Sequence, residues 1–483
     1  MSPRPVGDGG REHYFRGDAV LRVFGHHIPR SLLLLVALET LTLLGSFSIA
    51  HAWLMGDGLG GVGASLVGVG LLPAAVLLGT MQIAGLHDDH ALEGLLGMAV
   101  RLALAFAVGI LCLALLAAAG IRPRADGPWL VAGLVLALTL ITAERLCLFR
   151  WMYAERFRRR LLVLGSGPRA REIEQLIEGT ASGKRFHLVG YLAEAPLVGL
   201  GVSSSCPVWS LPQEGELQGF ATRHRVQEIV VAVRDRRGKL PIEQLLECKL
   251  NGVRVCDVST FMEREAGQIR LESLNASWLV FHDGFLRSGF GSFLKRVVDI
   301  GASLVLLVVG LPLMVLGALA IKLDDGGPIF YRQVRVGQHG RLFKLTKLRS
   351  MGVDAEAEGA RWASKGDRRI TRVGRCLRKT RIDELPQIVN VLLGHMSFVG
   401  PRPERPEFVA QLTRQIPYYG ARHSVKPGLT GWAQVRFPYG ASVSDSRRKL
   451  EYDLYYIKNY SIFLDALILL HTVRVVLFAR GAH

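Results

Sequence analysis

The sequence predicts a membrane protein of mixed α and α/β content, and three observations lead to this fold class. Hydrophobic residues make up 49% of the 483 residues, and they are gathered in a few long segments. A middle section alternates short apolar runs with glycine-rich and charged turns, which is typical of strands alternating with helices. The last third is dense in Arg, Lys, Gly and Pro, which favours a mainly helical domain with many ordered loops around a site.

Four long apolar stretches follow an arginine-rich N-terminal segment at residues 1–30. Each stretch has the roughly 20 residues that a helix needs to cross a hydrocarbon core. They lie near residues 31–52, 62–84, 95–120 and 127–147. We therefore expect a four-helix transmembrane domain over residues 31–150. The first stretch lacks a cleavage site followed by polar sequence, so it does not read as a removable signal peptide.

The arginines on both sides of these stretches indicate the orientation. The N-terminal segment is rich in arginine, and the exit of the fourth stretch is richer still, so both ends are expected on the cytoplasmic side. Arg122 and Arg124, in the loop at 121–126, conflict mildly with this orientation. Glu39 lies inside an apolar stretch, where an ionisable group is costly. The sequence assigns Glu39 no role.

Residues 159–275 are expected to form a Rossmann-like domain on the cytoplasmic side. The run RLLVLGSGPRAREIEQLI reads as a strand, a glycine turn and an amphipathic helix, and FHLVGYL, EIVVAV and GVRVCDV read as further buried strands. Gly165, Gly167 and Ala170 fit the G-x-G-x-x-A pattern that lets a phosphate approach a helix N-terminus. Pro168 and Arg169 are unusual in that pattern, so a structural or regulatory domain is favoured over a working dinucleotide site.

Residues 295–323 form a further apolar segment that is interrupted by proline. The segment is long enough to span, but Pro312 lies in its middle, two residues after Gly310. Proline removes a backbone hydrogen bond and clashes with the preceding turn, so we expect a sharp break at Pro312. A full crossing would place everything after it on the opposite side from the basic exit of the fourth stretch.

The charge of the chain narrows the class of partner. The formal net charge is +18, and the basic residues lack the aromatic interleaving of a nucleic-acid surface, so anionic lipid or a phosphorylated substrate is favoured. The six cysteines are far apart without a C-x-x-C pair, which argues against a zinc site. Clustered cations in the C-terminal domain would repel one another unless a polyphosphate lay among them. These cations are Arg332, Arg335, Lys344, Lys347, Arg349, Arg378, Arg381, Arg402 and Arg436.

Asp383 and Glu384 are adjacent carboxylates within this basic stretch. One carboxylate could attack phosphorus, and both could hold a magnesium ion bridging phosphates. They could equally form an acidic first turn of the helix that carries IVNVLL, with Pro386 early in that helix. Composition alone leaves both interpretations open.

From Lys295 to the C-terminus the sequence resembles the bacterial sugar transferases, the polyprenol-phosphate hexose-1-phosphate transferases. Several separate motifs appear in order over about 190 residues. They are KRVVDI, the proline-broken helix, FYRQVRVG, KLRSM, DELPQ, SFVGPRP, KPGLTGWAQV and YDLYYIKNYSIFLD. The resemblance implies that residues 324–483 form a phosphoglycosyl transferase domain. It also implies that the 295–323 helix re-enters the same leaflet.

The resemblance also implies a reaction and its residues. A nucleoside diphosphate-sugar, with UDP-glucose or UDP-galactose expected, would give its sugar-1-phosphate to undecaprenyl phosphate and so begin exopolysaccharide, O-antigen or capsule synthesis. Asp383 matches the nucleophile, and Glu384 matches its partner carboxylate at a Mg²⁺ site. Lys347 matches a lysine of that site, and Arg402 matches the loop at the nucleotide end. Arg349 and Arg436 are further expected substrate ligands.

The sequence departs from the family pattern at two places. Leu311 stands where the family commonly has a serine before the proline, and Arg436-Phe437-Pro438 replaces a common Asn-Gly-Arg run. The implied location is the bacterial cytoplasmic membrane, with the catalytic domain on the cytoplasmic face, and a homodimer is plausible. Tyrosines of the C-terminal helices, including Tyr455 and Tyr456, are expected to seat the catalytic unit at the membrane interface, and an ordinary core position is the alternative. A nucleotide-sugar dehydratase or epimerase and a non-catalytic assembly scaffold are the alternatives.

Overall fold

The fold was analysed in a computed structural model, and the chain divides into two compact units that are described separately. One unit contains the whole α/β sheet and parts of two apolar helices, and the other contains everything from Ser259 onward together with residues 47–131. The expected segment 1–30 lies mostly outside the described residues, as do Arg122, Arg124 and Pro438. The described residues are 20–23, 26–55, 70–87, 95–120, 128–152, 158–179, 182–193, 206–211, 216–233, 240–273, 289–355, 359, 367–437, 440 and 442–477.

Four of the described helices are long and apolar enough to cross a membrane. Three of them lie in the predicted stretches: α1 (Arg30–Met55), α4 (Leu95–Ala118) and α5 (Pro128–Met152). The fourth is the helix that contains Pro312. In the stretch predicted at 62–84, the described helix is α3 (Leu71–Ile83), whose 13 residues rise only about 20 Å.

Glu39 forms a buried ion pair inside the apolar part of the first unit. Its Oε1 atom lies 2.6 Å from Nη2 of Arg145, which joins α1 to α5. One turn further along α1, the Thr42 hydroxyl donates to Glu144. A buried charge needs a partner of this kind, so Glu39 holds two membrane helices together.

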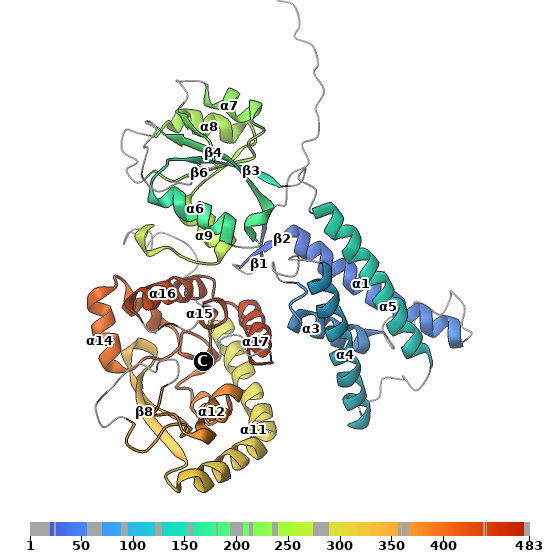
Figure 1. Cartoon of the computed structure of the whole chain (residues 1–483), viewed down its shortest axis with the longest axis vertical. Coiled ribbons are helices and arrows are strands. Elements are labelled where there is room, and N and C mark those ends of the chain that lie inside the picture. The colour runs from blue at the N-terminus through green and yellow to red at the C-terminus, as the bar shows by residue number, and fades with distance from the viewer. Residues whose placement is uncertain are drawn as a thin grey trace, which may run out of the picture. The chain divides into compact units, whose positions relative to one another are not determined.

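The middle section forms a five-stranded parallel sheet (Figure 1). The strand order is β5-β4-β3-β6-β7, so the first strand of the domain lies in the middle of the sheet. The four predicted strands are present, together with one short strand, β5, that was not predicted. The strands are β3 (Arg159–Leu164), β4 (Phe186–Ala193), β5 (Val208–Ser210), β6 (Glu228–Val231) and β7 (Arg254–Asp257), with helices α6 (Pro168–Gly179), α7 (Leu217–Arg223) and α8 (Ile242–Leu250).

The helix that contains Pro312 is assigned without interruption as α11 (Gly289–Asp325), and Figure 1 shows that it curves around the C-terminal elements. A straight helix of 37 residues would be about 55 Å long. Both ends of α11 nevertheless hold the same compact unit: Lys295 Nζ lies 2.5 Å from Asp465 Oδ2, and Asp325 pairs with Arg349. The helix therefore bends but is not interrupted, and Pro312 lies within it.

A β-hairpin follows α11, and here the expectation of loops was wrong. Strand β8 (Phe330–Val336) pairs antiparallel with β9 (Leu342–Leu348) over seven residues each. Exposed and less exposed side chains alternate along β8, which is the two-residue period of a half-buried strand. Arg332 and Lys344 are exposed, whereas Gln333, Arg335 and Lys347 lie on less exposed positions, so polar residues on both sides of the hairpin hide the pattern.

The remaining elements pack around one hydrophobic core. Tyr455 and Tyr456 are buried in it, so the expectation that these side chains seat the unit at the membrane interface was wrong. The segment before α11 also joins this unit, because Lys458 Nζ contacts Glu263 Oε2 at 2.8 Å. The elements are α9 (Val258–Ala266), α12 (Arg372–Thr380), α13 (Gln387–Leu392), β10 (Ser397–Val399), α14 (Pro406–Gln415), β11 (Gly428–Thr430), α15 (Trp432–Arg436), α16 (Val443–Lys458) and α17 (Ile462–Leu477).

Candidate active site

A tight junction between two helices presents Asp383 and Glu384. Helix α12 ends at Thr380 and is capped by Arg381, whose backbone has φ 61° and ψ 13°, a left-handed conformation that is uncommon for a residue with a side chain. A single 3-10 turn over Ile382–Glu384 follows, and Pro386 then caps α13 with φ −62°. Such backbone strain costs about 1–3 kcal/mol and is tolerated where the surroundings fix the geometry.

Asp383 is a buried carboxylate whose negative charge is poorly compensated. The residue is 5% exposed, and within the described part of the chain its Oδ1 atom has no hydrogen-bond partner. Burial, and next the charge of Glu384, raise the pKa of Asp383 to about 6, while Lys347 opposes the rise. The group therefore loses its proton near neutral pH and stays basic enough to attack an electrophile.

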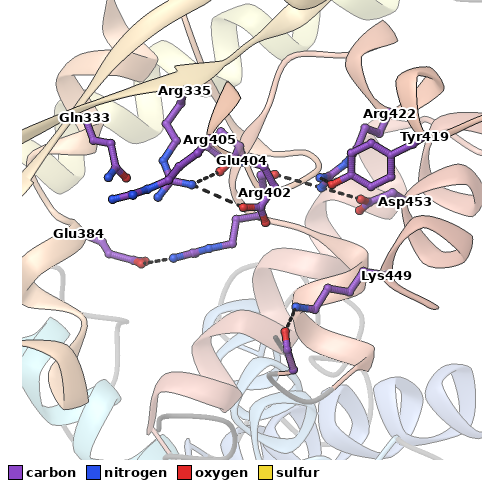
Figure 2. Close-up of polar contacts among 12 residues, drawn as sticks. Gln333, Arg335, Glu384, Arg402, Glu404, Arg405, Tyr419, Arg422, Lys449 and Asp453 are labelled. Atoms are coloured by element: carbon purple, nitrogen blue, oxygen red, sulfur yellow. Dashed lines mark hydrogen bonds and ion pairs between the residues drawn. The ribbon is translucent and has the colours of Figure 1, made fainter. Parts of the chain in front are cut away.

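Glu384 has the opposite character. Burial pushes its pKa up, but Arg402 and Arg381 more than offset this and hold the pKa at about 2. Arg402 Nη2 donates to Glu384 Oε1 at 2.9 Å (Figure 2). Arg381 Nη1 lies 3.6 Å from the same oxygen. Two neighbouring carboxylates with pKa values pushed apart are the pattern of groups with different chemical roles.

Lys347, on β9, is a partly buried lysine whose charge interacts with Asp383 and Glu384. Its Nζ lies 5.5 Å from the ring centroid of Tyr331 on the paired strand β8. Burial lowers the pKa of Lys347 to about 8, while Asp383 and Glu384 favour its charged form. The Tyr331 hydroxyl accepts from Gln333 Nε2 at 2.7 Å and from Arg405 Nη2 at 3.4 Å, which fixes the ring against the lysine.

The loop that carries Arg402 is fixed by hydrogen bonds from the buried Arg422 (Figure 2). Arg422 Nη2 donates to the backbone carbonyl of Arg402 at 3.0 Å and to Asp453 Oδ2 at 2.9 Å, and its Nη1 donates to the Tyr419 hydroxyl. Arg335, from β8, donates to the carbonyl of Pro403 at 2.9 Å. Both arginines thus donate hydrogen bonds to backbone carbonyls of the loop, and these bonds fix the position of Arg402.

Three glycines explain why the SFVGPRP and KPGLTGW motifs occur together. A Cβ atom on Gly428 would lie 2.1 Å from the backbone nitrogen of Gly400, and one on Gly431 would lie 2.2 Å from the Gly400 oxygen. The two motifs therefore touch backbone to backbone beside β10 and β11, which pair in parallel. This close approach fixes the start of the loop that leads to Arg402.

The donor set fits a magnesium ion shared with a phosphate ligand. The buried, unpartnered oxygen of Asp383 is a suitable ligand, and Glu384 lies next to it in the chain. No group of three or more His, Cys, Asp or Glu side chains able to hold a metal occurs among the described residues. Mg²⁺ is commonly held by one or two carboxylates plus substrate phosphates, which needs no larger cage.

Two expected ligands, Arg349 and Arg436, make contacts with other groups, and several residues that shape the site were not predicted. Arg349 is buried and pairs with Asp325 while donating to the Pro328 carbonyl, at the end of α11. Arg436 is exposed, with its guanidinium 4.5 Å from the Trp432 ring centroid. The residues not predicted are Tyr331, Arg405, Tyr419, Arg422 and Asp453. Tyr331 and Asp453 lie in the motifs FYRQVRVG and YDLYYIKNYSIFLD, but the contacts of all five depend on the fold.

The turn at Gly165 belongs to the other unit. Gly165 has φ +114°, and a Cβ there would lie 3.2 Å from the backbone of Ala232, so glycine is needed for this close approach. A Cβ on Gly167 would meet open space, and Ala170 is buried in α6. These contacts explain Gly165 structurally, and the ligand role of the turn stays a prediction.

The fold and this site define a membrane-associated protein with a buried carboxylate among cations, suited to a phosphorylated substrate. The model of the bacterial sugar transferase family matches residues 290–479. The chain belongs to that family, because it is 44% identical to a relative and the match covers 72% of that relative's length. That relative is a UDP-glucose:undecaprenyl-phosphate glucose-1-phosphate transferase of Caulobacter vibrioides, matched over 39% of this chain.

Two other relatives match a smaller share of their own length. A UDP-N-acetylgalactosamine-undecaprenyl-phosphate N-acetylgalactosaminephosphotransferase of Aeromonas hydrophila is 41% identical over 58% of this chain and 64% of its own. An undecaprenyl-phosphate glucose phosphotransferase of Komagataeibacter xylinus is 46% identical over 39% of this chain and 36% of its own. The chain thus spans less than two thirds of the length of these two relatives.

Proposed function

We propose that this protein transfers a sugar-1-phosphate from a nucleoside diphosphate-sugar to undecaprenyl phosphate through a covalent intermediate on Asp383. The observation that carries the proposal is the buried Asp383 carboxylate, which has an unpartnered oxygen and a pKa raised to about 6. It lies among cations that suit a diphosphate. The family membership and the activities in the names of the relatives support the same reaction class.

In the first half-reaction an oxygen of Asp383 attacks the β-phosphorus of the donor. The new bond joins this oxygen to phosphorus, and the bond from phosphorus to the bridging oxygen breaks, so the nucleoside monophosphate leaves with that oxygen and its electron pair. Arg402 and Lys347 are the cations placed to offset the charge on the phosphates. A bound Mg²⁺, held by Asp383 and Glu384, would supply further charge neutralisation to the diphosphate.

In the second half-reaction an oxygen of the lipid phosphate attacks the phosphorus held on Asp383. The bond between Asp383 and phosphorus breaks, the carboxylate is restored, and the product is the lipid diphosphate-sugar. Glu384 stays ionised throughout, because Arg402 and Arg381 hold its pKa low. No net proton transfer is needed in either half, so a separate general base is unnecessary.

The curvature of α11 supports the placement of this site at a single membrane face. Lys295 and Asp325, near opposite ends of the helix, contact the same unit, while the middle exposes apolar side chains such as Val308 and Val309. A Cβ on Gly310 would lie 3.5 Å from Leu385, two residues beyond Asp383. We propose that α11 enters and leaves the cytoplasmic face of the inner membrane, with Asp383 beside it.

We propose the class of the donor, a UDP-sugar, and not one particular sugar. UDP-glucose and UDP-galactose remain the expectation, and the names of the relatives add N-acetylgalactosamine. The strand order of the middle domain supports a Rossmann-like fold, for which no ligand is proposed. The dehydratase or epimerase and scaffold alternatives are not favoured by the comparisons.

The test uses the full chain in lipid nanodiscs with a panel of UDP-sugars, with and without undecaprenyl phosphate. Without acceptor, we expect release of about one nucleotide per active enzyme, and with acceptor continuous release. Absence of any release across the panel, in enzyme whose fold is verified by its thermal unfolding, would contradict the proposal. Release only when acceptor is present would contradict the covalent intermediate.

A further inference from the structure

We propose that the exposed basic face of α12 binds the anionic phospholipid headgroups of the bilayer that holds α11. The face, here called the α12 basic face, consists of Arg372, Arg375 and Lys379. The proposal rests on the apolar helix lying in the membrane and is independent of the transferase reaction. The lipid concerned is the bulk anionic phospholipid of the bilayer. The proposal therefore predicts that protection of α12 depends on the lipid composition.

The three cations form one stripe on a short helix. Positions 372, 375 and 379 are spaced i, i+3 and i+7, so they fall on the same side of α12. All three side chains are exposed, and among the described residues none has a recorded hydrogen bond or ion pair. α12 has no acidic residue to balance them, so the stripe keeps its positive charge in the protein alone.

The opposite face of α12 fixes the helix against α11. Leu377 is buried in a cluster with Ile321 of α11 and Leu348 of β9. Gly317 of α11 makes the close approach possible, because a Cβ there would lie 3.0 Å from Leu348 and 3.3 Å from Leu377. The stripe therefore cannot turn inward without unpacking this cluster.

The contacts also place α12 along the part of α11 that leads to its polar end. The backbone nitrogen of Val373 lies 3.4 Å from Asp324 Oδ2, while Leu377 lies by Gly317. Over this stretch α11 exposes Leu316, Leu319 and Leu323. The α12 basic face thus lies beside the point where an apolar helix gives way to charged residues, which is the depth of lipid headgroups.

The chemistry of the stripe suits phosphate headgroups. Lys and Arg keep their aliphatic stems on apolar surface while their charged ends reach the interface. Each basic residue near an anionic bilayer surface contributes about 1 kcal/mol, and salt weakens the effect. The nearby carboxylates, Asp324 and Asp325, already contact Val373 and Arg349, which leaves the three cations to external anions.

The test measures hydrogen exchange of peptides covering 372–380 in the full-length protein. Nanodiscs of phosphatidylcholine alone are compared with nanodiscs that also contain phosphatidylglycerol. We expect exchange about tenfold slower or more with phosphatidylglycerol, and loss of this difference at high salt. The variant R372Q/R375Q/K379Q should lose the difference, whereas the matched control R223Q/K249Q/R254Q, which removes three exposed cations of the other unit, should keep it.

Three results would overturn the proposal. They are equal exchange in both lipids, equal protection by inorganic phosphate in phosphatidylcholine discs, and equal loss in the control variant. Protection of the α11 peptides in phosphatidylcholine discs reports insertion of that helix separately. It also verifies that each variant is folded. The readout needs no donor or acceptor, so its failure is distinguishable from failure of the proposed reaction.

Discussion

Arg402 Nη2 lies 2.9 Å from Glu384 Oε1, and this contact separates the ionisation of two adjacent carboxylates. Glu384 is kept ionised by Arg402, while Asp383, one residue earlier, has its pKa raised by burial and by Glu384 itself. The loop that brings Arg402 into place is fixed by Arg422. The raised pKa of Asp383 therefore depends on the loop that carries Arg402, because Arg402 keeps Glu384 charged.

Replacement of Arg402 should disable the site without unfolding it. Arg402→Ala removes a charged donor to Glu384 and a cation for the substrate phosphates, so we expect turnover to fall about 10²–10³-fold. Arg402→Lys should restore part of the activity, since it keeps the charge but not the forked geometry. Steady-state nucleotide release measures both, with exposed Arg414→Ala on α14 as the control. Unchanged turnover in Arg402→Ala would remove Arg402 from the mechanism.

The rate should depend on pH in a bell shape. Asp383 must be ionised to attack, so the rate rises with pH through about 6, and Lys347 must be charged, so the rate falls above about 8. Lys347→Arg keeps the charge at all accessible pH values and should flatten the alkaline limb while lowering the maximum. A profile of kcat/KM from pH 5 to about 10 tests this. An alkaline limb that persists in Lys347→Arg would show that another group produces it.

Replacement of Asp383 should stabilise the C-terminal unit near neutral pH. The folded pKa of Asp383 is about 6, above the ordinary value of 3.8 for an aspartate, so between these values the folded protein holds a proton that the unfolded chain releases. Stability is therefore lost as pH rises from about 4 to about 6, and Asp383→Asn avoids this loss. We expect a gain of about 1–3 kcal/mol at pH 7. Chemical unfolding at pH 4 and pH 7 measures it, and a variant less stable at both values would contradict the assigned pKa direction.

The backbone contact between two motifs predicts a contrast between two glycines. Gly428→Ala places a methyl group against the backbone of Gly400 and should destabilise the unit by about 1–3 kcal/mol or more. A Cβ on Gly420 meets nothing within 4 Å, so Gly420→Ala should change stability little. The midpoints of thermal unfolding compare them. Similar midpoints for the two variants would mean that the loops do not touch as described.

The sequence predicted the elements whose pattern is local. The apolar runs gave α1, α4, α5 and α11, and the period of buried residues gave four strands of the sheet. It failed for the hairpin β8–β9, because Arg, Lys and Gln lie on both sides of those strands, and such a composition resembles that of a loop. It failed for Tyr455 and Tyr456 because an aromatic residue at an interface and one in a core have the same chemistry.

The candidate site was predicted by residue type but not by contact. Asp383 and Glu384 stood out as acidic residues in basic sequence, and their opposite pKa shifts depend on Arg402, Arg381 and burial, which only the fold defines. Arg349 was expected as a ligand because it lies in the basic KLRSM motif, and Arg436 because it follows the GWAQV motif. The fold pairs Arg349 with Asp325 instead, and it leaves Arg436 exposed beside Trp432.

The central claim is that Asp383 carries the sugar-phosphate between donor and acceptor. Enzyme in nanodiscs is incubated with donor labelled in the β-phosphate, without acceptor, then denatured and digested. We expect label on the peptide containing Asp383, its release by hydroxylamine, and its transfer when undecaprenyl phosphate is added before denaturation. Label retained by Asp383→Asn, or found on another peptide of the wild-type enzyme, would contradict it.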